Sequence, residues 1–153
     1  MISNIGSSIN NFKGIKKTEI FKEIKKAEHS IKENDTNEDN IYVKIAKKYD
    51  VTNLTHDEFV SMCHELRKAK EIDSGQCAIM TLDTSKIKVD GKYIKFQKNS
   101  LNYKFNEAFD GKKHNWIEHF ELRHQLSLKF GVKISYKNDI KHINLMKKIK
   151  AYQ

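Results

Sequence analysis

Apolar side chains three and four residues apart recur in several stretches of this chain, and that spacing constrains its fold more than any other feature. The clearest stretch begins with a capping-box pattern, in which Thr55 is the N-cap and Glu58 the third helical residue. Leu54 and Phe59 flank this box in the positions of a hydrophobic staple. Since apolar residues continue at helical spacing behind it, the pattern predicts a helix over residues 56–70.

Similar stripes predict further helices, and the absence of proline is compatible with long ones. Asp73 would cap one of them, with Gln76 in its third position. Asp110 would cap another, which Gly131 would end in the left-handed conformation. Residues 98–111 have apolar positions in register but no clear boundary. The predicted helices cover residues 16–33, 41–49, 74–82, 112–130 and 136–151.

The fold class that follows is mainly α, a compact bundle of four to six helices. One segment has a different pattern, because Asp90-Gly91 suits a tight type I′ turn between β-branched and aromatic residues. A two-stranded hairpin around residues 87–96 would be marginal in water and would need helices to lie on. The bundle with this small hairpin and the bundle without it both remain open.

The expected core consists of the apolar residues on the inward stripes of these helices. Phe130 is also expected to bury its ring beside the end of its helix. The core set is Ile20, Ile24, Ile31, Phe59, Met62, Leu66, Trp116, Phe120, Ile140, Ile143 and Ile149.

The chain is expected to form one domain. Residues 1–14 are rich in Ser, Asn and Gly and predict a flexible N-terminal tail, so that residues 15–153 would be a single helical domain. No apolar run is long enough to predict a transmembrane segment, and the first residues do not have the pattern of a secretory signal. Two cysteines without dense spacing indicate reduced thiols. These features predict a cytoplasmic protein.

A strongly basic composition raises the possibility of nucleic-acid binding. The net charge is +9, but 27 lysines stand against two arginines, and Arg is the residue that reads guanine edges and clamps phosphate bidentately. A solvated helix face, an acidic protein partner or a membrane surface would equally suit a lysine-rich helix. The residues that would bind nucleic acid or an acidic partner are Lys137, Lys141, Lys147, Lys148 and Lys150.

Two acid-x-x-His pairs on consecutive helices could serve a metal-dependent enzyme. Glu121 and His124 share one helix face, and Asp139 and His142 share another, as the ligands of di-iron bundles do. A di-metal site also needs inward carboxylates from other helices, and none stands out on an apolar stripe. Surface helix pairs explain both patterns equally well. We therefore expect no catalytic residues, no metal and no cofactor, particularly since no phosphate loop or nucleophile elbow is present.

Three stretches carry a resemblance to other proteins. Residues Asn53–Asp83, Trp116–Arg123 and Lys129–Gly131 resemble segments of small uncharacterised proteins of Gram-positive Firmicutes. The resemblance covers about a third of the chain, includes no catalytic motif and implies a bacterial source.

The function expected from these observations is a non-enzymatic protein-interaction module in a bacterial cytoplasm, such as a regulator, an adaptor or a chaperone-like protein. Its partner would be another protein, an acidic one being one option. The alternatives are a nucleic-acid-binding regulator that uses the lysine-rich C-terminal helix and a metal-dependent enzyme at the acid-x-x-His pairs.

Overall fold

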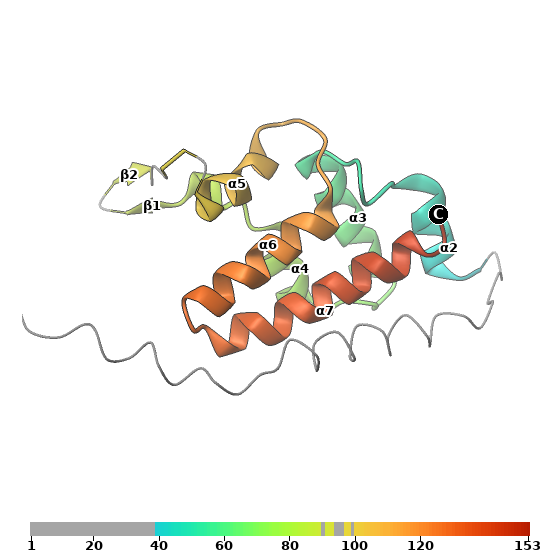
Figure 1. Cartoon of the computed structure of the whole chain (residues 1–153). Helices are drawn as coiled ribbons and strands as arrows, with labels where there is room; N and C mark the ends of the chain where they lie inside the picture. Colours follow the sequence, from blue (N-terminus) through green and yellow to red (C-terminus); the bar gives the residue numbers. More distant parts are fainter. Residues whose placement is uncertain (1–38, 90, 94–96, 99) are drawn as a thin grey trace, which may run out of the picture. The chain divides into compact units, whose positions relative to one another are not determined.

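The described part of the chain is mainly helical, which confirms the predicted fold class (Figure 1). In this computed structural model the described residues are 39–89, 91–93, 97–98 and 100–153. Their six α-helices are α2 (Ile41–Lys48), α3 (His56–Lys68), α4 (Ser74–Thr81), α5 (Leu101–Asn106), α6 (Trp116–Lys129) and α7 (Lys133–Lys150). Two short 3₁₀ helices are η2 (Thr84–Lys86) and η3 (Glu107–Phe109).

Several predictions fall on residues that are not described. The tail over residues 1–14 and the helix over residues 16–33 lie outside the described residues, together with Ile20, Ile24 and Ile31. Among the described helices, none is long and apolar enough to cross a bilayer.

The hairpin that the sequence left open is present as two very short strands. β1 (Lys88–Val89) pairs antiparallel with β2 (Lys92–Tyr93). Gly91 has a φ of +75°, the left-handed backbone that the predicted turn requires at this position.

The helix starts at Thr55 and Asp73 follow the predicted capping boxes. The Glu58 backbone N–H donates to Thr55 Oγ1 at 3.2 Å, and the Thr55 N–H donates to Glu58 Oε2 at 2.8 Å. The Gln76 N–H donates to Asp73 Oδ1 at 2.7 Å, and the Asp73 N–H donates to Gln76 Oε1 at 3.1 Å. Each box satisfies donors that the first turn of a helix leaves without partners.

Two helices end in the same hydrogen-bonded motif, one with the expected glycine and one without it. After α6, Gly131 has a φ of +70°, and the Val132 N–H donates to Ser127 O at 2.9 Å. After α3, Lys70 has a φ of +62°, and the Glu71 N–H donates to Leu66 O at 3.0 Å. Both are Schellman endings, so Lys70 occupies a conformation that glycine adopts at lower cost.

The start of α6 differs from the prediction. Asn115, not Asp110, is its N-cap, and its side chain accepts from the Ile117 N–H at 3.1 Å. Asp110 instead accepts from the Lys112 N–H and from His114 Nε2, both at 2.8 Å. Residues 112–115 are not helical, because His114 forms an isolated antiparallel bridge with Leu54.

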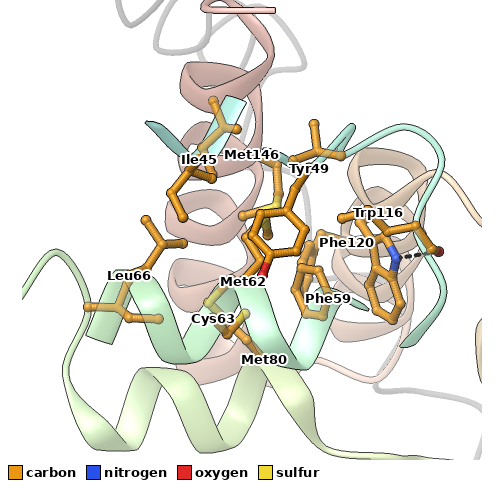
Figure 2. Packing of buried hydrophobic residues seen from close by; sticks show 14 of the residues in the cluster. Ile45, Tyr49, Phe59, Met62, Cys63, Leu66, Met80, Trp116, Phe120 and Met146 are labelled. Atoms are coloured by element: carbon orange, nitrogen blue, oxygen red, sulfur yellow. Dashed lines mark hydrogen bonds between the residues drawn. The ribbon is translucent and has the colours of Figure 1, made fainter. Parts of the chain in front are cut away.

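The core is centred on aromatic residues of α3 and α6 (Figure 2). The rings of Phe59 and Trp116 stack with their centroids 3.9 Å apart, and the Trp116 Nε1–H donates to Leu54 O at 3.0 Å. Helices α6 and α7 pack side by side, α2 lies against α7 and α3, and α4 lies against α3 (Figure 1). The predicted core residues confirmed as buried are Phe59, Met62, Leu66, Trp116, Phe120, Ile143 and Ile149.

Two predicted core positions are wrong. Phe130 is 62% exposed because it is the C-cap of α6 and lies in the turn to α7. Ile140 is half-buried, since α7 turns Asp139 and His142 inward instead. Helix α7 also begins at Lys133, three residues earlier than predicted.

Both cysteines are free thiols inside the core. Cys63 lies on the buried stripe of α3, and burial raises the pKa of its thiol. Cys77 on α4 is buried too, with its Sγ 3.8 Å from His64 Nδ1.

Candidate functional site

Four polar side chains between α6 and α7 form a largely buried cluster, called here the polar cluster: Arg123, Ser127, Asp139 and His142. Arg123 Nε donates to Asp139 Oδ1 at 2.5 Å, and the Ser127 hydroxyl donates to Asp139 Oδ2 at 2.7 Å. Arg123 Nη2 donates to His142 Nδ1, and Nη1 donates to Ile79 O at 3.2 Å. Asp139 is 0% exposed, and its carboxylate is held from both sides.

The polar cluster is electrically neutral near pH 7. The charges of Arg123 and Asp139 cancel each other. Burial, and then the charges of Arg123 and Lys141, lower the pKa of His142 to about 4, so its imidazole is uncharged. Because a guanidinium can only donate, His142 Nδ1 accepts and the proton of the neutral ring lies on Nε2.

The structure places the two predicted acid-x-x-His pairs in different surroundings. Asp139 and His142 do share a face, but both are buried, so their interpretation as a surface pair is wrong. The Arg123 guanidinium binds both side chains, through Nε to Asp139 Oδ1 and through Nη2 to His142 Nδ1. Glu121 instead pairs with Lys147 at 3.3 Å. Within the described residues no group of three His, Cys, Asp or Glu side chains is placed to hold a metal ion.

A pocket of about 300 Å³ opens beside the polar cluster. Its rim is apolar, and the side chains of Ile79, Leu82 and Ile134 on this rim are 46%, 54% and 79% exposed. Arg123 and Asp139 lie on its wall. The remaining lining residues are Met80, Thr84, Phe105, His119, Ser127, Ser135 and Asn138.

His119 contributes a polar group to this pocket that no protein group satisfies. Its ring is buried and stacks on Phe105 with centroids 4.3 Å apart, and its side chain makes no hydrogen bond within the described part of the chain. Burial, followed by the charge of Arg123, lowers the pKa of His119 to about 3. The pocket therefore combines an apolar rim, a neutral imidazole and a compensated ion pair.

The five lysines predicted to bind an acidic partner or nucleic acid are not equivalent. Lys147 pairs with Glu121, and Lys150 lies 3.7 Å from Asp50 Oδ1. Lys148 Nζ lies 3.6 Å from the ring centroid of Tyr42, a cation–π contact between α7 and α2. These contacts explain part of the basic composition as packing between helices. The two exposed lysines of the set without an ion pair among the described residues are Lys137 and Lys141.

Sequence reasoning missed the central residue of this site, Arg123. It is one of two arginines in a chain of 27 lysines, and that rarity was the available signal. The planar guanidinium of arginine has five N–H donors in fixed directions and can bind three acceptors at once, which suits this site better than the ammonium group of lysine.

Comparison with protein-family models, with curated proteins and with solved structures finds no match to this chain.

Proposed function

We propose that the protein is a non-enzymatic protein-interaction module that receives an apolar side chain of its partner in the pocket beside the polar cluster. The observation that supports this proposal is the exposed apolar rim around that pocket. Branched aliphatic side chains that remain half-exposed next to a cavity are typical of surfaces that another molecule covers. A regulator, an adaptor or a chaperone-like protein would use such a surface.

The chemistry of the pocket favours binding over catalysis. The Ser127 hydroxyl donates to a carboxylate that Arg123 already neutralises, so neither group is free to act as nucleophile or base. His142 uses Nδ1 to accept from Arg123. His119 and the unused N–H groups of Arg123 can instead hydrogen-bond an uncharged group that enters beside the apolar rim.

The charge around the pocket indicates which partner would fit. Lys137 and Lys141 follow Ile134 on the exposed stripe of α7, and the carboxylate on the pocket wall, Asp139, is buried and neutralised. A partner segment with an apolar anchor and acidic flanks would be attracted to this face, mainly through a faster rate of association. The cytoplasmic location remains a prediction from the sequence.

The test is partner capture with variants of the rim. Ile79→Ser combined with Leu82→Ser removes two exposed apolar side chains and should leave the fold intact. Ile87→Ser is a matched control, since this isoleucine is also exposed but does not line the pocket. We expect one stoichiometric protein to be recovered from the native lysate with wild type and with Ile87→Ser, and lost with the rim variant.

The capture experiment has two outcomes that contradict the proposal. One is the absence of any stoichiometric protein partner, measured by pull-down and by light scattering of the recovered fraction. The other is a partner that the rim variant retains with wild-type affinity. Thermal unfolding of each variant checks that a lost partner does not result from a lost fold.

A nucleic-acid-binding regulator remains the alternative, and the exposure of Lys137 and Lys141 is the observation that favours it. Filter binding over a salt series tests it. If these two lysines neutralise phosphates, Lys137→Gln with Lys141→Gln should lower the slope of log affinity against log salt by about 2. Binding that does not depend on salt would rule out this function.

A further inference from the structure

We infer that the turn between α6 and α7 is a docking surface for an anionic lipid bilayer. This turn, called here the apolar turn, spans residues 128–134. It presents four exposed apolar side chains in seven residues, namely Leu128, Phe130, Val132 and Ile134. The inference goes beyond the proposed protein-binding function, because it assigns a different kind of partner to a surface that shares only Ile134, Lys137 and Lys141 with the protein-binding face.

All four apolar side chains of the turn are exposed to solvent. Phe130 and Ile134 are 62% and 79% exposed, and Leu128 and Val132 are also exposed. The Schellman ending at Gly131 holds the backbone of this turn through hydrogen bonds of its own. The side chains are therefore not needed to close the turn, and they are free to enter an apolar phase.

Positive charge surrounds these side chains without exposed negative charge in the same segment. From Leu122 to Asn138 the sequence contains no Asp or Glu. The next acid, Asp139, is 0% exposed and is neutralised by Arg123. Lys129 is exposed within the turn, and Lys137 is exposed three residues after its end. These ammonium groups would attract an anionic surface, and no exposed carboxylate within residues 122–139 would repel it.

The first half of α7 continues the same surface. Ile134, Lys137 and Lys141 are spaced three and four residues apart, which places them on one stripe of the helix. All three are exposed, and the lysines have no ion pair among the described residues. An apolar tip followed by a basic stripe is the arrangement with which peripheral segments lie in a membrane interface.

At the apolar turn itself, a bilayer fits better than a protein does. Lysine supplies a point charge, whereas arginine has the planar geometry required for bidentate recognition. A point charge is sufficient for lipid headgroups, because their binding requires no fixed geometry. In the sequence of the turn Lys129 stands between Leu128 and Phe130, and its side chain is exposed as theirs are, so charge and apolar groups are presented together. A second copy of this chain is a poor occupant, because the lysines of two copies would repel each other.

The experiment is co-sedimentation of the full chain with vesicles. The probes are phosphatidylcholine vesicles and vesicles of phosphatidylcholine with phosphatidylglycerol. We expect binding to the anionic vesicles, and weak or no binding to the neutral ones. Phe130→Ser with Val132→Ser should lower the partition coefficient at least tenfold, about the effect of losing burial of one large apolar side chain. Neither of these residues lines the pocket.

A second variant tests the charges separately. Lys137→Gln with Lys141→Gln should weaken binding to anionic vesicles by about fivefold for each lysine, and added salt should reduce the difference. Ile87→Ser is the control for general loss of exposed apolar surface and should bind as wild type does.

Three results would overturn the inference. The first is an absence of binding to either vesicle. The second is binding that the Phe130→Ser/Val132→Ser variant keeps unchanged, which would place the contact elsewhere in the chain. The third is loss of a captured acidic protein, but not of vesicle binding, in this variant. The pocket variants Ile79→Ser and Leu82→Ser test the proposed function independently, so either idea can fail alone.

Discussion

Arg123 on α6 and Asp139 on α7 form an ion pair with 2.5 Å between Nε and Oδ1, although 16 residues separate them in the sequence. The Asp139 side chain is 1% exposed and that of Arg123 18%. The carboxylate is therefore removed from water and the guanidinium largely so, and the energetics of the pair differ from those of the lysine pairs on the surface.

Removal of one member of this pair should be strongly destabilising. Asp139→Ala leaves the guanidinium buried without its counter-charge, and we expect the free energy of unfolding to fall by about 3–5 kcal/mol in urea titrations. Lys150→Ala, which breaks the exposed pair with Asp50, is the control and should cost about 0–1 kcal/mol. Similar losses in the two variants would mean that burial of the Arg123–Asp139 pair carries no special cost.

A double replacement separates charge from packing. Arg123→Met with Asp139→Leu removes both charges and keeps most of the volume, so it should recover most of the stability that Asp139→Ala loses. The same urea titrations measure this recovery. If the double variant is less stable than Asp139→Ala, the hydrogen bonds to Ile79 O and His142 outweigh the desolvation of the charges.

Stability should fall in mild acid because of two buried histidines. The folded-state pKa values of about 3 for His119 and about 4 for His142 lie below the ordinary value of 6.5. Below pH 6.5 the unfolded chain therefore takes up protons that the folded chain does not. The contribution of the two histidines to stability is fully present above pH 6.5 and is lost as the pH falls toward 4 and 3. Between pH 7 and pH 5 we expect the free energy of unfolding to fall by about 2 kcal/mol for each histidine.

A variant assigns this acid sensitivity to a residue. His119→Phe keeps an aromatic ring against Phe105 and removes one titrating group, so the loss of stability between pH 7 and pH 5 should be about 2 kcal/mol smaller than that of wild type. Urea titrations at the two pH values give the comparison. An unchanged pH dependence would show that His119 is not the group responsible.

Glycine at position 70 should stabilise the protein. Lys70→Gly relieves the left-handed strain at φ +62°, and this gain exceeds the entropy that glycine adds to the unfolded chain. We expect an increase of about 0.5–1 kcal/mol in the free energy of unfolding. Gly131→Ala is the opposite change in the same motif and should cost about 1 kcal/mol. Destabilisation by Lys70→Gly would contradict the strain assigned to this ending.

Trp116→Phe should be moderately destabilising. The replacement removes the Nε1–H donor and part of a fully buried ring, but Leu54 O keeps its bond from the His114 N–H at 2.9 Å. Because no acceptor is left unsatisfied, we expect a loss of about 1–3 kcal/mol in thermal or urea unfolding. A much larger loss would mean that the stack with Phe59 depends on the indole.

The sequence predicts local features of this fold well. The capping boxes at Thr55 and Asp73 involve residues three positions apart, so the pattern contains all the groups that make the contact. The start of α6 was misplaced because its boundary depends on the bridge between Leu54 and His114, which are distant in the sequence. Local signals at Asp110 could not reveal that constraint.

The candidate site was harder to predict for the same reason. The spacing of Asp139 and His142 shows that they share a helix face, but not that this face is turned inward. Their burial is explained by Arg123, whose position on the neighbouring helix becomes apparent only when α6 and α7 are packed. Phe130 was expected inside because aromatic rings usually are, whereas its place at the C-cap puts it in the turn.

The burial of Cys63 and Cys77 provides a reporter of conformational opening. We expect a thiol reagent such as a maleimide to react with neither side chain until the surrounding helices separate. The rate of labelling under native conditions would then follow the exposure of α3 and α4 without any engineered probe. An added surface cysteine, by contrast, would label at once and could carry a dye for distance measurements, with both natural thiols left in place.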